Sequence, residues 1–159
     1  EAGVKARLEG FVNKKGTKSV DHFHRRLGKV MWNKVGMARN EKGLKEAIKE
    51  IQQIREEFHK EVMVPGGAYE FNPELEKAAR VEDFIELGEL FAKDALHRTE
   101  SCGGHFREES QTPEGEALRD DVNFSFTSAW EWKGVNSAPV LHKEILSFKD
   151  IELKQRSYK

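Results

Sequence analysis

The sequence predicts a mainly α fold, an antiparallel three-helix bundle followed by an extended C-terminal tail that contains a short β-hairpin. Three segments carry apolar residues at spacings of three and four, and each follows a residue that favours a helix start. Short turns separate them, which favours antiparallel neighbours. Later the pattern changes to alternation and turn signals. We therefore expect a linker or short helix from an upstream domain at 1–18, the bundle at 19–99, and a motif loop with the tail at 100–159.

The first helix of the bundle is predicted to begin after Ser19, a good N-cap residue, and to end near Gly36. Its apolar face is formed by Val20, Phe23, Leu27, Val30, Met31 and Val35. His22 and His24 lie about 200° apart around this helix, so they cannot chelate one metal ion together.

The second and third helices have clear boundaries. The second follows Asn40 and ends at the helix-breaking sequence Val64-Pro65-Gly66-Gly67. Its apolar face is formed by Leu44, Ala47, Ile48, Ile51, Ile54, Phe58 and Val62. The third starts at Asn72-Pro73, a capping residue followed by proline at the first helical position. Its wide apolar stripe predicts contacts on more than one side, and consists of Leu75, Ala78, Ala79, Val81, Phe84, Ile85, Gly88, Leu90, Phe91, Ala95 and Leu96.

The tail is predicted to contain two strands. Apolar residues alternate with polar ones from Val122, and the strand continues to Trp132 before a turn at Lys133-Gly134. A return strand is expected from Val140 to Ile145. Two strands alone are marginally stable in water. We therefore expect this aromatic tail to pack on the bundle, on another domain or on a partner.

Composition and charge exclude several classes of function. The 27 basic and 28 acidic residues are interleaved and leave a net charge of -1, so there is no broad basic face for nucleic acid. A single cysteine excludes an intrachain disulfide and indicates a reducing compartment. No apolar run approaches the roughly 18 residues of a membrane-spanning helix. The start at Glu1 rather than Met suggests that upstream residues have been removed.

The stretch Leu96–Gln111 gathers side chains that invite a catalytic or metal interpretation. The spacing of Cys102 and His105 provides neither a lowered thiol pKa nor a base on a separate element. Together with His97 they lack a fourth zinc ligand and a paired cysteine. Three carboxylates of the third helix are interpreted as a solvated face, namely Glu82, Asp83 and Glu86. We therefore predict no catalytic, cofactor-binding or metal residue in the chain.

The same stretch is better suited to docking. Gly103 and Gly104 permit a sharp backbone turn. The charges around them are too dense for a buried loop unless they pair locally or bind a polar surface elsewhere. A simpler alternative remains, a glycine-capped helix end with exposed charges. The candidate interdomain docking residues are Arg98, Glu100, Ser101, Gly103, His105 and Arg107.

These residues resemble the Arg-x-Glu-Ser-Arg-Gly-x-His-x-Arg segment near the C-terminus of flavoprotein subunits of succinate dehydrogenase and fumarate reductase. Further similar segments are Met31–Asn40, Gly43-Leu44, Glu86–Leu90, Leu118–Asp121 and Gln155–Lys159. The last two resemble the type with a single di-haem membrane anchor. One departure is Cys102-Gly103-Gly104, which stands where most of the family has Arg-Gly-Ala. The family arginine at that position therefore has no counterpart here.

The resemblance implies a C-terminal helical domain similar to a spectrin repeat, with a structural and docking role. It implies that the whole subunit interconverts succinate and fumarate with FAD. Electrons then pass to an iron-sulfur subunit and to quinone, and the iron-sulfur clusters and haem belong to partner subunits. The flavin-holding and substrate residues lie upstream in the family and match nothing here, so this chain is expected to be inactive and without a cofactor.

The implied partners are the flavin domain of the same chain, the iron-sulfur subunit and, indirectly, the membrane cytochrome b anchor. The implied location is cytoplasmic, peripheral on the inner face of the cell membrane through partner subunits. Two alternatives stay open, the same domain of an aspartate oxidase-like flavoprotein and a stand-alone helical protein-interaction module. The Arg156-Ser157-Tyr158 ending favours the dehydrogenase and reductase side over the oxidase. The gene upstream of Glu1 distinguishes the module from the flavoproteins.

Overall fold

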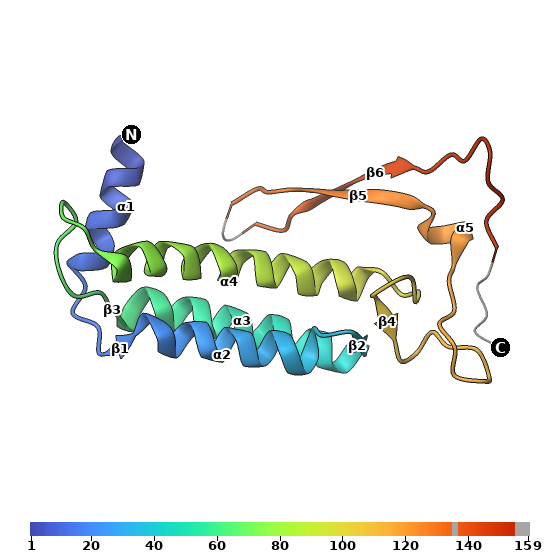
Figure 1. The fold of residues 1–159 in the computed structure, drawn as a ribbon, viewed down its shortest axis with the longest axis horizontal. Helices are drawn as coiled ribbons and strands as arrows, with labels where there is room; N and C mark the ends of the chain where they lie inside the picture. The colour runs from blue at the N-terminus through green and yellow to red at the C-terminus, as the bar shows by residue number, and fades with distance from the viewer. Residues whose placement is uncertain (135–136, 155–159) are drawn as a thin grey trace. The chain divides into compact units, whose positions relative to one another are not determined.

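The structure is a computed structural model that describes residues 1–134 and 137–154 (Figure 1). Its contacts divide the chain into two compact units, Glu1–Thr99 and Glu100–Lys159. The ending at 155–159, which carries part of the sequence resemblance, lies outside the described residues. Within the described ranges, no helix combines the length and the apolar character that a membrane crossing requires.

The first unit is helical. Its helices are α1 (Ala2–Val12), α2 (Val20–Lys34), α3 (Glu41–Glu61) and α4 (Pro73–His97). The helices α2, α3 and α4 each contact the other two, and α1 contacts α4. Consecutive long helices run in opposite directions (Figure 1). The predicted mainly α class is therefore confirmed, whereas the similarity to a spectrin repeat stays a prediction.

Side-chain caps begin the three long helices at the predicted residues. The side-chain oxygens of Ser19, Asn40 and Asn72 accept hydrogen bonds from the backbone N–H three residues later, at 3.3, 2.7 and 3.1 Å. These bonds satisfy amides that have no partner inside the first helical turn. The amide nitrogen of Asn72 also donates to the carbonyl oxygens of Pro65 and Gly67, at 2.8 and 3.1 Å. It thereby holds the loop that precedes α4.

The core of the first unit lies between the three long helices and includes one residue of α1. The fully enclosed Phe58 of α3 is its centre, with ring centroids 5.9 Å from Phe11 of α1 and 5.2 Å from Phe23 of α2. Both contacts are edge-to-face, the arrangement that aromatic rings prefer. Buried members of the predicted faces include Val20, Leu27, Val30, Leu44, Ala47, Ile51, Ile54, Val62, Leu75, Ala78, Val81, Ile85 and Ala95.

Short strands join the ends of these helices. The strands β1 (Lys18–Ser19) and β3 (Val62–Met63) pair in parallel, and β2 covers Ala38–Arg39. Gly16 lets the chain pass the end of α3, because a Cβ atom there would lie 2.2 Å from the carbonyl oxygen of Glu61. Two-residue strands leave no periodic pattern, and for that reason the sequence did not predict this pairing.

The second unit is irregular apart from a hairpin. Its elements are β4 (Phe106–Arg107), α5 (Asp121–Phe124), β5 (Phe126–Glu131) and β6 (Val140–Ile145). The strands β5 and β6 pair antiparallel, with Phe126 opposite Ile145 and Glu131 opposite Val140. The predicted hairpin is confirmed. Lys143 of β6 covers the ring of Phe126, with its Nζ atom 4.2 Å from the ring centroid.

The predicted start of the first tail strand at Val122 is wrong. Residues Asp121–Phe124 form a helical turn instead, and the strand begins at Phe126. The side chain of Asp120 accepts hydrogen bonds from the backbone N–H and the side-chain amide of Asn123, at 3.1 and 2.8 Å. An aspartate that caps a turn in this way competes with the extended conformation. The alternation of apolar residues before Phe126 therefore did not indicate a strand.

Glu57 of α3 forms an ion pair that links three elements, with Arg26 of α2 at 2.5 Å and with Lys18 of β1. Hydrogen bonds from Arg26 and then from Lys18 lower the pKa of Glu57 to about 2. A carboxyl group whose pKa is lower in the folded state adds stability above its unfolded pKa of about 4.3. That contribution is lost as the pH falls toward about 2.

The Glu57→Gln substitution is therefore expected to lower the free energy of unfolding at pH 7 by about 1 kcal/mol, since the ion pair is partly exposed. Urea unfolding measured from pH 7 down to pH 2 should show the two proteins converging in acid. Glu56→Gln, at an exposed neighbouring position, is the matched control. A constant gap between wild type and variant across that range would contradict the expectation.

Candidate functional site

Residues 100–107 of the second unit form a closed loop around the glycine pair. The backbones of Cys102 and His105 exchange two hydrogen bonds, at 2.8 and 3.0 Å. Gly103 makes the turn between them with a φ of +59°, a conformation that favours glycine. At the base of the loop, the hydroxyl of Ser101 accepts the backbone N–H of Arg107 at 2.8 Å and donates to its carbonyl oxygen at 3.2 Å. The sharp turn expected from the glycines is present.

Three of the six candidate docking residues are buried. Glu100, Ser101 and Arg107 are only 3%, 0% and 3% exposed. A carboxylate oxygen of Glu100 accepts the backbone N–H of Asp120 at 2.9 Å, and the Nε atom of Arg107 donates to Glu109 at 3.0 Å. These charged and polar groups therefore brace the loop from within the second unit. Local pairing was one of the alternatives that the sequence left open, but it did not predict Asp120 and Glu109 as the partners.

The tip of the loop is open. Cys102, Gly103 and Gly104 are exposed, and a Cβ atom built on either glycine would meet nothing within 4 Å. The φ of Gly104 is not positive, so nothing in the described chain requires glycine at that position. Of the two remaining candidates, His105 is half-buried, and Arg98 belongs to the first unit, where its backbone N–H donates to the carbonyl oxygen of Asp94 at the end of α4, at 3.0 Å. Within this loop, the tip at Gly103 and Gly104 presents exposed backbone that a partner can approach closely.

The side chains considered above as metal ligands or catalytic groups do not form such a site within the described residues. In the part of the chain that the structure describes, no three His, Cys, Asp or Glu side chains gather in a way that could hold a metal ion. Glu82 and Asp83 of α4 bind the guanidinium of Arg7 from α1, at 2.5 and 2.7 Å. These carboxylates fasten α1 to α4, a partnership across some 75 residues that helical periodicity cannot reveal.

Glu89 of α4 is a functional candidate that the sequence reasoning missed. Its side chain is 5% exposed and contacts Arg55 at 2.5 Å, Lys93 at 2.7 Å and the amide of Gln52 at 2.9 Å. Burial disfavours the charged carboxylate, but the hydrogen bonds and the positive charges together lower the pKa of Glu89. The signal in the sequence was its position four residues after the buried Ile85, on the apolar face of the helix.

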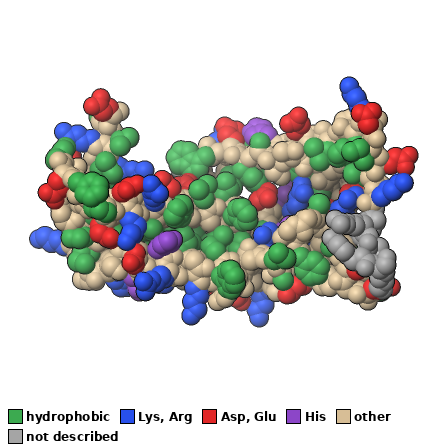
Figure 2. Space-filling model, in the orientation of Figure 1, with side chains coloured by type: hydrophobic (Ala, Val, Ile, Leu, Met, Phe, Trp, Pro, Cys, Tyr) green, Lys and Arg blue, Asp and Glu red, His purple; other side chains and the backbone are tan. Residues whose placement is uncertain are grey.

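The first unit also has an apolar groove, which we call the α2/α4 groove, with a volume of about 270 Å³. It is lined by His24, Leu27, Gly28, Met31, Phe84, Leu87, Gly88 and Phe91. Phe84, Leu87 and Phe91 of α4 remain 44%, 58% and 59% exposed, although the opposite part of the apolar stripe of α4 is buried in the core. Hydrophobic side chains also gather on the face shown in Figure 2, over the helices. The wide apolar stripe predicted for this helix thus has one buried and one exposed part.

Comparison with known proteins gives consistent matches. The family model described as fumarate reductase flavoprotein C-term matches residues 24–158. A fumarate reductase flavoprotein subunit of Helicobacter pylori is 36% identical over 96 residues, which are 60% of this chain and 13% of that protein. An uncharacterized FAD-dependent oxidoreductase of Methanocaldococcus jannaschii is 34% identical over 109 residues, or 69% of this chain and 19% of its own length.

Solved structures share the fold. A chain of E. coli quinol fumarate reductase superposes with a TM-score of 0.79 at 24% identity, covering 95% of this chain and 25% of that one. A chain of the Mycobacterium smegmatis Sdh1 complex gives a TM-score of 0.73 at 23% identity, over 89% of this chain and 23% of the other. The present chain therefore spans a quarter or less of the length of these similar proteins.

Proposed function

The chain belongs to the family of C-terminal domains of fumarate reductase flavoproteins, and from that premise we propose that it is the structural module of a succinate dehydrogenase or fumarate reductase flavoprotein subunit. In the whole subunit, FAD exchanges a hydride with succinate or fumarate. Electrons travel through a partner iron-sulfur subunit to quinone at a haem-bearing membrane anchor. The subunit then lies on the cytoplasmic face of the membrane without crossing it.

The observation that carries this proposal is the family match over residues 24–158. Relatives devote three quarters or more of their length to other regions, and we place flavin binding and substrate chemistry there. The succinate and fumarate assignment over other substrates is supported by the Arg98-to-Arg107 motif and by the matched fumarate reductase subunits. The single di-haem anchor type stays a prediction.

We assign two roles within the motif loop. Glu100, Ser101 and Arg107 are the internal frame: Ser101 and Arg107 hold the two ends of the loop together, and Glu100 ties the loop to the backbone of Asp120. Gly103, with its neighbour Gly104 and the half-buried His105, is the contact surface for the flavin-binding part. Arg98, at the end of α4 in the first unit, is a separate candidate contact for the flavin-binding part.

The experiment uses the full-length subunit and a substitution that should affect docking but not the stability of the isolated chain. Gly104→Leu places a side chain in open space, so the isolated chain should keep its melting temperature. In the full subunit, the same change should lower the melting temperature by several degrees and reduce the flavin retained after purification. Glu114→Leu, an exposed loop position in the same unit, is the control. Unchanged flavin content and melting temperature for both Gly104→Leu and Arg107→Ala would refute the docking role.

A second candidate has its own support. The Methanocaldococcus jannaschii protein is a FAD-dependent oxidoreductase whose similarity covers 69% of this chain, so a related flavoprotein with another substrate, such as an aspartate oxidase, is the alternative. Assays of the full subunit with succinate and with L-aspartate separate the two. In either case the isolated 159 residues should purify without flavin, and a flavin-bearing preparation would contradict the structural role.

A further inference from the structure

Gly28 stands in the middle of α2, where nothing in the described chain accounts for a glycine. A glycine inside a helix is about 1 kcal/mol less favourable than alanine. A Cβ atom on Gly28 would meet nothing within 4 Å, so a larger residue fits. On the opposite wall of the α2/α4 groove, Gly88 is different, because its Cβ would lie 3.2 Å from the sulfur of Met31 and 3.4 Å from Leu27. Gly88 thus packs closely against side chains of α2, whereas Gly28 leaves open space in the groove.

The exposed part of the groove has the form of a binding face. Phe84, Leu87 and Phe91 are spaced by three and four residues, so they form one continuous stripe along α4. Large exposed apolar side chains that lie together mark interaction sites more often than isolated ones do. The stripe is distinct from the buried one, which packs against α2 and α3. A partner that covers it also removes the apolar surface from water.

Basic or polar groups stand at both ends of the stripe. The ring of His24 lies 6.0 Å from the ring of Phe84, and the guanidinium of Arg39 lies 5.8 Å over the ring of Phe91. Arg39 is oriented there by a 2.5 Å hydrogen bond to the carbonyl oxygen of Gly36. An apolar stripe with a cationic group at one end and a polar imidazole at the other is complementary to an amphipathic segment whose carboxylates flank its apolar side chains.

The size of the stripe favours an occupant from the same chain. Three partly exposed side chains of this kind supply roughly 300 Å², whereas a stable complex of free partners buries about 800 Å² per partner. A segment of the same polypeptide binds at a high effective concentration and needs less surface. The relatives in this family carry most of their length outside the matched region.

We propose that the α2/α4 groove is the binding site for an amphipathic segment of the flavin-binding part of the same subunit. Its apolar side chains lie on Phe84, Leu87 and Phe91, and its carboxylates face His24 and Arg39. Gly28 lets this segment approach the backbone of α2 closely. The inference rests on the proposed function, since it names a second contact between this module and the flavin-binding part.

The test compares amide hydrogen exchange of residues 84–91 in the isolated chain and in the full-length subunit. Exchange should be at least tenfold slower in the full subunit, because the segment covers the exposed face of α4. Gly28→Leu fills the groove and should abolish the difference, while the isolated variant keeps or raises its melting temperature. Gly10→Leu is the matched control, because Gly10 is also helical with open space around it but lies outside the groove.

Equal exchange of residues 84–91 in both proteins would overturn the proposal, and so would slower exchange that Gly28→Leu leaves intact. Protection that appears in the isolated chain and rises with its concentration would assign the groove to a second copy instead. These readouts do not depend on flavin. A failure of the proposed docking role shows as unaltered flavin content and melting temperature in both the Gly104→Leu and the Arg107→Ala subunits, so the two failures are distinguishable.

Discussion

Replacing Phe58 with alanine is expected to lower the free energy of unfolding by about 3–5 kcal/mol, the range typical of a phenylalanine removed from a packed core. The ring is fully enclosed and meets Phe11 and Phe23 edge-on. One substitution therefore removes the contact shared by α1, α2 and α3. The cavity left behind cannot collapse easily, because the surrounding side chains come from separate helices.

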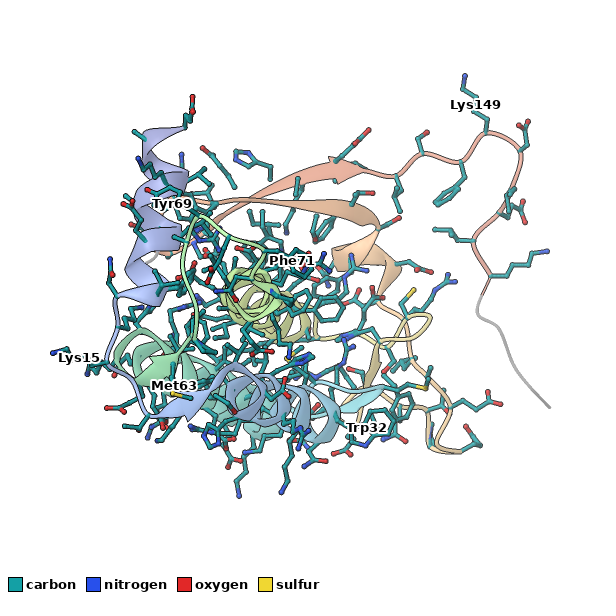
Figure 3. The ribbon with its side chains drawn as sticks, turned by 60° about the vertical axis from the view of Figure 1, so that its left-hand side comes forward. Lys15, Trp32, Met63, Tyr69, Phe71 and Lys149 are labelled. Carbon is teal, nitrogen blue, oxygen red and sulfur yellow. The ribbon has the colours of Figure 1, made fainter. Side chains whose placement is uncertain are left out.

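Urea unfolding followed by circular dichroism measures the effect of the Phe58→Ala substitution. Phe71→Ala is the control, since that ring is 95% exposed in the loop before α4 and should change the stability by less than about 0.5 kcal/mol (Figure 3). A loss below about 1 kcal/mol for Phe58→Ala would show that the aromatic cluster is not the centre of the core.

The Glu89→Ala substitution is expected to destabilise the chain by about 3 kcal/mol, because removing one partner of a buried ion pair leaves the other charge uncompensated. Arg55 would keep its charge with only 16% of its side chain exposed, and Gln52 would lose its acceptor. The carboxylate joins α3 to α4, so the loss acts on the largest helix interface of the first unit.

The stabilisation that Glu89 provides should decrease at acidic pH. The pKa of Glu89 is lower in the folded state than its usual value of about 4.3, so its contribution is present above that pH and disappears as the pH falls through the folded pKa. The Glu89→Ala variant and the wild type should therefore converge in acid. Glu76→Ala removes an exposed pair with Arg80 and should have an effect of about 0.5 kcal/mol or less. Equal losses for the two variants would contradict the burial argument.

Local chemistry explains which parts of the fold could be predicted. The three long helices begin at Ser19, Asn40 and Asn72 because a capping oxygen there stands three residues before an amide that needs it. The return strand at Val140–Ile145 is also where the alternation predicts it. The predicted start of the first strand was wrong, because the side chain of Asp120 stabilises a helical turn there. The alternation of apolar residues gives no sign of this turn.

Long-range partnerships explain what could not be predicted at the candidate site. The sequence identified the loop around Gly103 by its composition, yet it could not show that Ser101 and Arg107 would bind each other and be enclosed. Likewise, Arg7 looks like an ordinary surface charge, and the position of Glu89 on the apolar face of its helix does not reveal which cations it binds. Their roles depend on which helix packs beside them, and periodicity describes only one helix at a time.

The attachment of α1 has a consequence for the order in which the first unit opens. Its single buried side chain is Phe11, with Leu8 and Val12 partly buried against the core. Beyond these contacts, α1 is held by the ion pairs of Arg7 with α4 and by a hydrogen bond from Tyr69, which Figure 3 labels, to Glu9. An 11-residue helix that contains two glycines is not stable by itself in water. Detachment of α1 is therefore a local unfolding event that needs less free energy than loss of the long helices. We therefore expect the first unit to unfold in two stages, in which α1 detaches while the long helices stay folded.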